Sequence, residues 1–253
     1  RKKFLKEQLD KKMSLIIPCK NEEGNIKNII EESKKNLKFS YEIVFIDDKS
    51  SDNTLSLMKK TRDENVDIEI KIINGFGKGK SKAIDEGVRS ATGYYSVIFD
   101  ADLTVSMKDM NLFYWAISNG NGDLINGSRL IYKPYSGAMK KLNYLGNIFF
   151  SKLVTYITDE NISDTLCGSK CFKTHDFKIF KEFEDKNNIH DLWGDFNILF
   201  ASTFYGLKCI DLPVRYYERL EGETKMTKRM YFFKNMLLTC FKAFNRFKIN
   251  FDK

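Results

Sequence analysis

The stretch SVIFDADLTV, residues 96–105, places two carboxylates directly after a run of apolar residues. The run ends at Phe99, and Asp100 and Asp102 follow with a single alanine between them. In an extended segment residues i and i+2 point to the same side, so both acids are expected to face one ligand. Carboxylate oxygens are preferred ligands of Mg²⁺ and Mn²⁺. A turn with helix-capping acids is the alternative interpretation.

Short apolar runs alternate with helix-like segments around this stretch. Strands are predicted in 13–21, 41–48, 68–73 and 94–103, with helices after each of the first three and a glycine-containing loop at 74–79. Ser51 or Asp52 is predicted to cap the second helix. The alternation indicates a mostly parallel α/β sheet with flanking helices, in which ligands bind beyond the carboxyl ends of the strands. Three polar groups should therefore meet at one edge: residues 18–22, 47–48 and 100–102.

The pattern changes after Asp102. Helices are predicted in 107–120, 139–158 and 193–206, and strands in 122–131 and 207–219; residues 163–177 are predicted as a polar loop that runs into a short strand. We divide the chain into a charged lead-in at 1–12, one domain at 13–226 and a basic, aromatic helical tail at 227–253. Within the domain, residues 13–105 are predicted to bind a nucleotide and residues 106–226 to face the acceptor. The tail is either a packed terminal helix or a membrane-interfacial one.

Composition narrows the functional class. The chain has 253 residues, 42% of them hydrophobic, and a formal net charge of +8, which fits a partner that carries phosphates. Five cysteines without regular spacing favour packed thiols in a reducing compartment. No apolar run is long enough for a transmembrane helix, and no nucleic-acid-binding motif is present. Because the chain begins at Arg1, we expect it to be a piece of a longer protein.

Seven motifs, in a fixed order, resemble those of family-2 inverting glycosyltransferases with the GT-A fold. The resemblance is strongest to the branch of dolichol-phosphate mannosyltransferases and polyprenol-phosphate sugar transferases, and it covers most of residues 13–226. The motifs are IIPCKNEEGNI (16–26), IVFIDDKSSDNT (43–54), GKGKSKAIDEGVRSATG (77–93), FDADLTV (99–105), NGSRL (126–130), DTLCGSKCF (164–172) and LPVRYYERLEGETKM (212–226).

The resemblance implies a role for individual residues. Asp100 and Asp102 would bind a Mg²⁺ or Mn²⁺ ion that bridges the two donor phosphates. Arg129 would face a phosphate of donor or acceptor, and Arg219 and Lys225 would close over the pyrophosphate from a mobile loop. Lys78, in the glycine loop, is a further possible phosphate contact. The nucleotide base and ribose would be contacted by Pro18, Asn21, Glu22, Asp47 and Asp48.

The acceptor side allows two interpretations. Asp195 is predicted at the head of a helix, either as a first-turn acid or as the general base that an acceptor hydroxyl needs and an ionised phosphate does not. Asp164 and Lys170 are placed on the acceptor side by the resemblance. This chain has Lys49 and Cys167-Gly168-Ser169-Lys170 where the family often has glycine and S-G-F-R, which leaves donor and acceptor identity open.

We therefore expect a metal-dependent inverting hexosyltransferase that uses a UDP- or GDP-linked sugar. The favoured acceptor is a lipid-linked polyprenyl phosphate, and the alternative is a sugar or lipid hydroxyl with Asp195 as base. A second alternative is a non-catalytic domain that binds a nucleotide sugar within a larger glycan-assembly protein. The expected location is cytoplasmic, peripheral on the cytosolic face of a membrane. The sequence does not indicate an oligomeric state.

Overall fold

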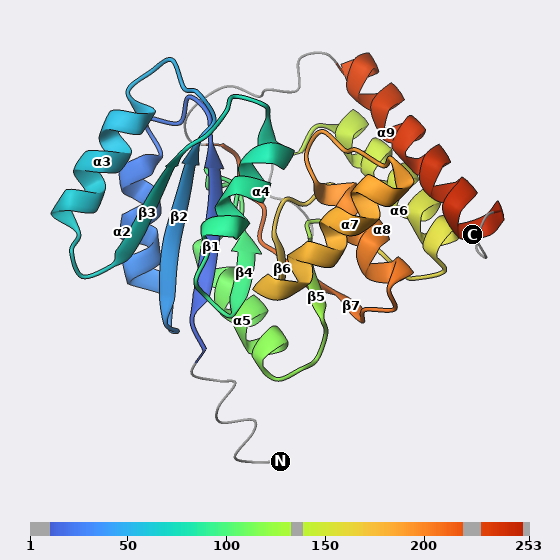
Figure 1. Cartoon of the computed structure of the whole chain (residues 1–253), viewed down its shortest axis with the longest axis horizontal. Coiled ribbons are helices and arrows are strands. Elements are labelled where there is room, and N and C mark those ends of the chain that lie inside the picture. The colour runs from blue at the N-terminus through green and yellow to red at the C-terminus, as the bar shows by residue number, and fades with distance from the viewer. Residues whose placement is uncertain (1–10, 133–138, 220–228, 250–253) are drawn as a thin grey trace.

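Seven strands form one sheet in the order β3-β2-β1-β4-β6-β5-β7 (Figure 1). The structure, a computed structural model, describes residues 11–132, 139–219 and 229–249. β6 runs antiparallel to its neighbours β4 and β5, and every other pair is parallel. The predicted mostly parallel sheet is therefore confirmed. The strands are β1 Met13–Cys19, β2 Tyr41–Asp47, β3 Glu69–Asn74, β4 Tyr95–Ile98, β5 Leu124–Ser128, β6 Lys170–Lys173 and β7 Cys209–Pro213.

Helices cover both faces of the sheet because the buried strands are apolar on both sides. In β1, Leu15 and Ile17 pack in one core, with side chains of α2, α3 and α5. Ile16 packs in the other core, with side chains of α4 and α6 to α9. The α-helices are α2 Ile26–Asn36, α3 Thr54–Glu64, α4 Lys80–Ser90, α5 Met110–Ser118, α6 Lys141–Thr158, α7 Phe177–Asn187, α8 Asp195–Phe204 and α9 Arg229–Phe244. The 3₁₀ turns η1 Met107–Asp109 and η2 Thr174–Asp176 precede α5 and α7, and the π-helical segment η3 Asn245–Ile249 follows α9.

The structure corrects three expectations. Helix α3 begins at Thr54 with Asn53 in the cap position, and Asp52 Oδ1 instead accepts the Thr54 N–H at 3.0 Å. Helix α7 was not predicted, although Phe177, Phe180 and Phe183 have helical spacing and are buried. β4 ends at Ile98, which is earlier than the apolar run, because the chain turns after Phe99.

Parts of the predicted lead-in, domain and tail lie outside the described residues. The lead-in at 1–12 is described only from Lys11, and Lys225 is among the residues that the structure does not describe. Within the described ranges, no helix is both long and apolar enough to span a lipid bilayer.

Candidate active site

The carboxyl ends of β1, β2 and β4 bring the predicted polar groups to one edge of the sheet. The strands are parallel and adjacent, with Cys19 paired to Asp47 and Ile16 paired to Ile98. Residues 20–22, Asp48 and Asp100–Asp102 directly follow these strand ends. The convergence expected from the α/β pattern is therefore present, and it places the candidate donor site at this edge.

Asp100 and Asp102 each bind a basic side chain. Lys80 Nζ lies 2.6 Å from Asp100 Oδ1, and Arg219 Nη2 lies 2.6 Å from Asp102 Oδ2. The two acids do not lie in an extended segment as predicted, because residues 101–102 form a turn. Asp102 Oδ1 accepts the N–H of Thr104 at 3.1 Å, and this contact draws the chain away from the strand direction.

The electrostatics of the acidic pair are dominated by burial and by these cations. Burial acts to raise the pKa of Asp100, but the charge and hydrogen bond of Lys80 together with the charges of Arg129 and Lys170 outweigh it, so that pKa lies below its usual range. Burial and the nearby Asp100 carboxylate raise the pKa of Asp102, against the opposing charge of Arg219. Burial acts to lower the pKa of Lys80, but Asp100 and Asp195 raise it overall. Opposite charges thus keep both Asp100 and Lys80 ionised in a partly buried site.

Two residues of this cluster were missed by the sequence analysis. Lys80 is the first residue of α4 and follows the glycine loop in which only Lys78 was singled out. Lys78 is exposed, with its ammonium 5.9 Å from the centre of the Phe76 ring. Gly168 is the second, because a Cβ there would lie 2.3 Å from Asp100 Oδ2 and 2.7 Å from Lys80 Nζ. The absence of a side chain at 168 is what leaves room for the Asp100 carboxylate.

The geometry fits a divalent cation of the kind that the resemblance implies. Asp100 and Asp102 are close enough for their charges to interact, and Gly168 leaves room for the Asp100 carboxylate. Hard cations such as Mg²⁺ take few protein oxygens and complete their shell with water and phosphate. Glu184, Asp185 and His190 form another group with ligand atoms within 4.8 Å. Glu184 there already binds Lys181 and His190, so we read that group as a surface ion-pair network.

The predicted nucleotide-side residues are tied together by backbone contacts. Asn21, with a left-handed φ of 52°, accepts the Ser51 N–H on its Oδ1 at 2.8 Å. Asp48 Oδ2 accepts the Gly79 N–H at 3.1 Å, which attaches the glycine loop to the end of β2. Asp47 is buried, and its Oδ1 accepts the Ser50 N–H at 3.2 Å.

Pro18 and Glu22 complete this side of the edge. Pro18 lies within β1 and is partly exposed. The Glu22 N–H donates to Thr54 Oγ1 at 2.8 Å, and Glu22 Oε1 lies 3.9 Å from Arg219 Nη1. Arg219 therefore reaches both Glu22 and Asp102, so it links the nucleotide-side residues to the acidic pair.

Arg129 and Asp164 form a bidentate ion pair on the acceptor side. The Nε–Oδ2 distance is 2.8 Å and the Nη2–Oδ1 distance is 2.9 Å. Asn147 of α6 donates to Asp164 Oδ1 at 2.8 Å, so this helix is connected to the site. Burial acts to raise the pKa of Asp164, but the Arg129 charge lowers it overall. Nε and Nη2 both bind Asp164, and the Arg129 side chain is 13% exposed.

Lys170 and Asp195 form a second ion pair below the surface. Lys170 Nζ lies 2.9 Å from Asp195 Oδ1 and also donates to the carbonyl of Cys167. Lys170 is fully buried and Asp195 is 4% exposed. Asp195 begins α8, as predicted. The Lys170 ammonium therefore binds Asp195 inside the protein and does not face solvent on the acceptor side.

Asp191 orients the start of α8. Its Oδ2 accepts the Phe196 N–H at 2.7 Å and its Oδ1 accepts the Trp193 N–H at 3.0 Å. Burial, and next the charge of Asp195, raise the pKa of Asp191 to about 6.

Cys167 and Cys171 are free and buried, as expected for packed thiols, and burial raises the pKa of Cys167 to about 11.

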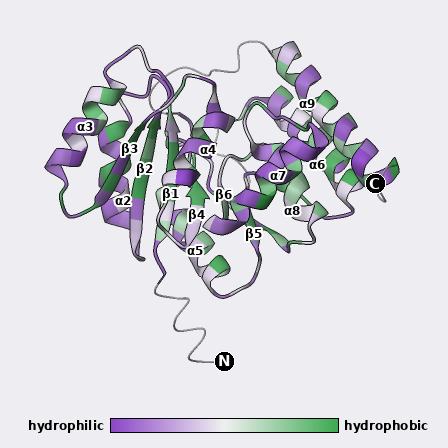
Figure 2. Cartoon of the chain, in the orientation of Figure 1, coloured by the Kyte–Doolittle hydropathy of each residue, from purple (hydrophilic) through white to green (hydrophobic). Residues whose placement is uncertain are grey.

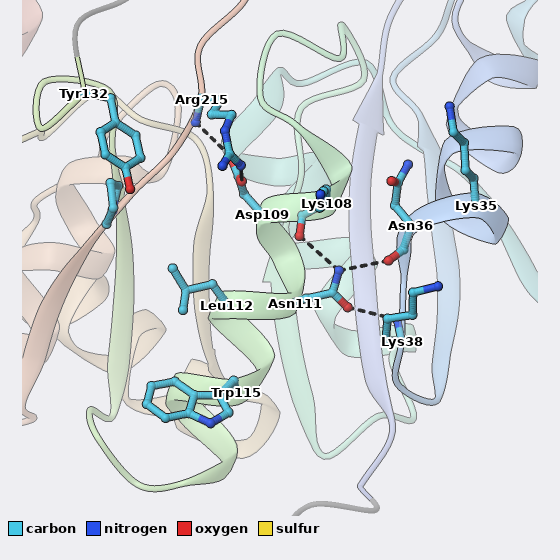
Figure 3. Close-up of a pocket in the computed structure, with 11 residues that line it drawn as sticks. Lys35, Asn36, Lys38, Lys108, Asp109, Asn111, Leu112, Trp115, Tyr132 and Arg215 are labelled. Atoms are coloured by element: carbon cyan, nitrogen blue, oxygen red, sulfur yellow. Dashed lines mark hydrogen bonds and ion pairs between the residues drawn. The ribbon is translucent and has the colours of Figure 1, made fainter.

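A groove of about 740 Å³ lies away from all these residues (Figure 3). Its walls are the carboxyl end of α2, the helix α5 and the segment after β7, and Leu112, Trp115 and Tyr132 supply its apolar part. Asn111 holds two of these walls together, since it donates to the Asn36 carbonyl at 2.9 Å and accepts the Lys38 N–H at 2.9 Å. None of the predicted site residues lines this groove.

Known proteins resemble this chain both in sequence and in structure. A dolichyl-phosphate beta-glucosyltransferase of Dictyostelium discoideum is 32% identical over 175 residues, 63% of this chain and 53% of that protein. A dolichol-phosphate mannosyltransferase of Pyrococcus furiosus is 28% identical over 232 residues, 87% of this chain and 61% of that protein. The chain thus spans between about a half and two thirds of the length of these relatives.

Solved structures share the fold. Glucosyl-3-phosphoglycerate synthase of Mycobacterium tuberculosis, with Mn²⁺, UDP and phosphoglyceric acid, aligns with a TM-score of 0.65 at 14% identity, over 96% of this chain and 82% of that one. The mannosyltransferase PcManGT of Pyrobaculum calidifontis, with GDP-Man and Mn²⁺, aligns with a TM-score of 0.57 at 18% identity, over 87% of this chain and 59% of that one. The predicted GT-A fold is confirmed. Residues 14–206 match the model of glycosyl transferase family 2, and the chain belongs to that family.

Proposed function

We propose that this protein is a metal-dependent inverting hexosyltransferase that moves a sugar from a UDP- or GDP-linked donor to a polyprenyl phosphate. The observation that carries the proposal is the convergence of Asp100 and Asp102 with Lys80 and Arg219 at the carboxyl edge of the sheet, with both ion-pair distances at 2.6 Å. Acids that can hold a cation lie beside bases that can hold phosphates. This combination fits a nucleoside diphosphate leaving group.

Asp100 and Asp102 would hold Mg²⁺ or Mn²⁺, which supplies Lewis-acid stabilisation of the departing diphosphate when bound. The basic groups have a complementary role: Lys80 and Arg219 orient the pyrophosphate and neutralise its developing charge. Glu22, Asn21 and Asp48 position the nucleoside end. Support for a divalent ion also comes from the two structural neighbours that contain Mn²⁺ together with a nucleotide or nucleotide sugar.

The buried Lys170–Asp195 pair favours a phosphate acceptor over a hydroxyl. A general base must be free to take a proton, whereas Asp195 is already bound to an ammonium inside the protein. An ionised phosphate needs no base but needs positive charge, and Arg129 would supply it from the acceptor side when the phosphate competes with Asp164 for the guanidinium. The relatives named for dolichyl and dolichol phosphate point the same way. A lipid-borne acceptor places the reaction at a membrane, and we place this chain at its cytosolic face.

The test is turnover of UDP- and GDP-sugars with Mn²⁺ and a polyprenyl phosphate, in wild type and Asp102→Ala. Wild type should transfer a sugar from at least one donor, and Asp102→Ala should lose that activity while its thermal unfolding stays cooperative. Asp67→Ala is the matched control, since Asp67 is an exposed acid that binds Lys34 and precedes β3, at the sheet edge opposite the site. Donor-induced thermal stabilisation without turnover would support the non-catalytic alternative. Full activity of Asp102→Ala would contradict the proposal.

A further inference from the structure

Helices α6 and α9 expose apolar side chains on the faces that a soluble protein usually makes polar. On α6, Leu142, Leu145, Phe149 and Tyr156 are between 48% and 64% exposed, and their spacing places them in one stripe along the helix. The opposite face of the same helix buries Phe150, Val154 and Ile157 in the core. Helix α6 is therefore apolar on two sides, of which only one is covered by the described residues.

Helix α9 is likewise apolar on both a buried face and an exposed face. Met230, Leu238 and Phe241 are between 53% and 68% exposed and lie on one face, with Lys234 among them. Met236, Cys240 and Ala243 on the other face are buried. Figure 1 places α9 at the outer edge of the molecule, and Figure 2 shows hydrophobic segments along it.

The two exposed faces join into one surface, which we call the α6–α9 face. The rings of Phe149 and Phe233 stack with centroids 6.2 Å apart, and those of Tyr156 and Phe244 with centroids 6.3 Å apart. Phe149 is 48% exposed and Phe233 is 38% exposed, so the seam between the helices is itself apolar and open. Contiguous exposed apolar side chains of this kind mark an interaction site.

The two segments that form the α6–α9 face are strongly basic, although one of their lysines, Lys248, binds Asp159, the residue that follows α6. Residues 139–158 and 229–249 contain eight Lys and Arg and not one Asp or Glu. The other 34 Lys and Arg are balanced by the 34 Asp and Glu of the chain, so these two segments account for the whole net charge of +8. Protein–protein interfaces are depleted in lysine, whereas interfacial membrane helices combine aromatic and leucine side chains with Lys and Arg over anionic headgroups.

We propose that the α6–α9 face docks on an anionic lipid bilayer and brings Arg129 to the membrane surface. The connection runs through α6, whose buried side carries Asn147. Asn147 donates to Asp164 Oδ1 at 2.8 Å, and Asp164 holds Arg129 in its bidentate pair. One helix therefore contacts lipid on its outer side and positions the acceptor-side arginine on its inner side. The second half of this inference rests on the proposed transfer to a lipid phosphate, whereas the docking does not.

The experiment is co-flotation of the full chain with vesicles of phosphatidylcholine alone and of phosphatidylcholine with 30% phosphatidylglycerol, a composition chosen on the order of natural anionic leaflets. Wild type should bind the anionic vesicles at least about tenfold more tightly than the neutral ones, and added salt should weaken the binding. Leu145→Glu with Phe241→Glu should lower that affinity by at least about tenfold, because two charges would be forced into the apolar headgroup boundary. Equal binding to both vesicles, no binding, or unchanged binding of the double variant would each overturn the proposal.

Matched controls separate docking from folding and from self-association. Val66→Glu with Trp115→Glu also adds two acids at apolar positions, 90% and 54% exposed, on other elements, and it should bind like wild type apart from the small loss that two added negative charges cause. Circular dichroism melts should show both double variants folded. If sedimentation shows a dimer that Leu145→Glu with Phe241→Glu dissociates, and no vesicle binding occurs, the face is a contact between two copies and the lipid proposal is wrong.

Turnover distinguishes this proposal from the proposed function. With a short, water-soluble prenyl phosphate, Leu145→Glu with Phe241→Glu should keep wild-type activity, since its site is unchanged. With long-chain polyprenyl phosphate in anionic vesicles, the same variant should lose activity by about the factor by which its vesicle affinity falls. Wild type without turnover on either acceptor would contradict the transferase proposal while leaving vesicle docking in place. Equal loss on both acceptors would contradict the role of the face in delivering the acceptor.

Discussion

Lys170 and Asp195 form an ion pair of 2.9 Å in which the lysine is completely buried. Taking two charges out of water is costly, so such a pair is retained only when each charge compensates the other. The pair joins β6, the antiparallel strand, to the first residue of α8. It therefore fixes the head of α8 against the sheet beside the acidic pair, whose partner Lys80 also feels the charge of Asp195.

Removal of one partner should be far worse than removal of both. Lys170→Met leaves a buried carboxylate without its cation and should lower the free energy of unfolding by about 3–5 kcal/mol. Lys170→Met combined with Asp195→Leu should recover most of that loss. Urea unfolding measures each value. Lys27→Met, at an exposed i,i+4 pair with Glu31, is the control and should cost less than about 0.5 kcal/mol. Equal effects of the two single lysine variants would show that the buried pair does not stabilise the fold.

Comparing a phosphate acceptor with a hydroxyl acceptor tests whether Asp195 acts as a general base. With a polyprenyl phosphate, Asp195→Asn should retain kcat within about tenfold of wild type, because the acceptor oxygen is already ionised. A hydroxyl acceptor would lose on the order of 10²–10⁴-fold through the missing base. Arg129→Ala should abolish use of the phosphate, since it removes the acceptor-side cation. A loss above a hundredfold with the phosphate, in a variant that still melts cooperatively, would assign Asp195 as a base.

Gly168 should control metal affinity through Asp100. In Gly168→Ala the new methyl group would lie 2.3 Å from Asp100 Oδ2, so the carboxylate must move. Changes that displace a metal ligand indirectly cost on the order of 10–100-fold in affinity, and the Mn²⁺ concentration that half-saturates thermal stabilisation by nucleoside diphosphate should rise by that factor.

Gly146→Ala is the matched control for this substitution. It lies inside α6 with no heavy atom within 4 Å of its new methyl group. It should leave Mn²⁺ dependence unchanged and stabilise the protein by about 0.5–1 kcal/mol through its higher helix propensity. An unchanged Mn²⁺ response in Gly168→Ala would show that Asp100 does not depend on that glycine.

Because the pKa of Asp191 is raised in the folded state, the free energy of unfolding should fall as pH rises. Burial, followed by the charge of Asp195, raises its folded pKa to about 6, whereas its unfolded value is 3.8. The folded state therefore binds more protons than the unfolded state between these two values. The stabilisation is fully present below pH 3.8 and is lost as pH rises through about 6. Relative to Asp191→Asn, wild type should lose about 2–3 kcal/mol between pH 4 and 7, measured by urea unfolding.

Glu42 provides a control of opposite sign. Burial acts to raise its pKa, but hydrogen bonds from Lys71, Ser14 and Thr92 outweigh this and lower the pKa to about 2. Its stabilisation is present above 4.5 and is lost as pH falls toward 2, so the advantage of wild type over Glu42→Gln should shrink on acidification. The same pH trend in both comparisons would contradict the assignment of Asp191.

The alternation of apolar runs and helical segments was enough to predict the strands, their mostly parallel order and the edge at which Asp48, Asp100 and Asp102 meet. These features depend on local periodicity and on the rule that parallel strands end on one side. The antiparallel direction of β6 depends on how the chain returns to the gap between β4 and β5. Nothing in the residues 170–173 themselves records that direction.

The sequence by itself determined the fold class and which acidic residues gather at the candidate site, because periodicity and strand ends are encoded locally. Only the tertiary structure decided the partners of those acids: Lys80 with Asp100, Arg219 with Asp102, Lys170 with Asp195 and Arg129 with Asp164. The closest of these pairs in the sequence is separated by 20 residues, and the farthest by 117. Such contacts follow from chain packing, which brings together side chains whose spacing in the sequence carries no signal.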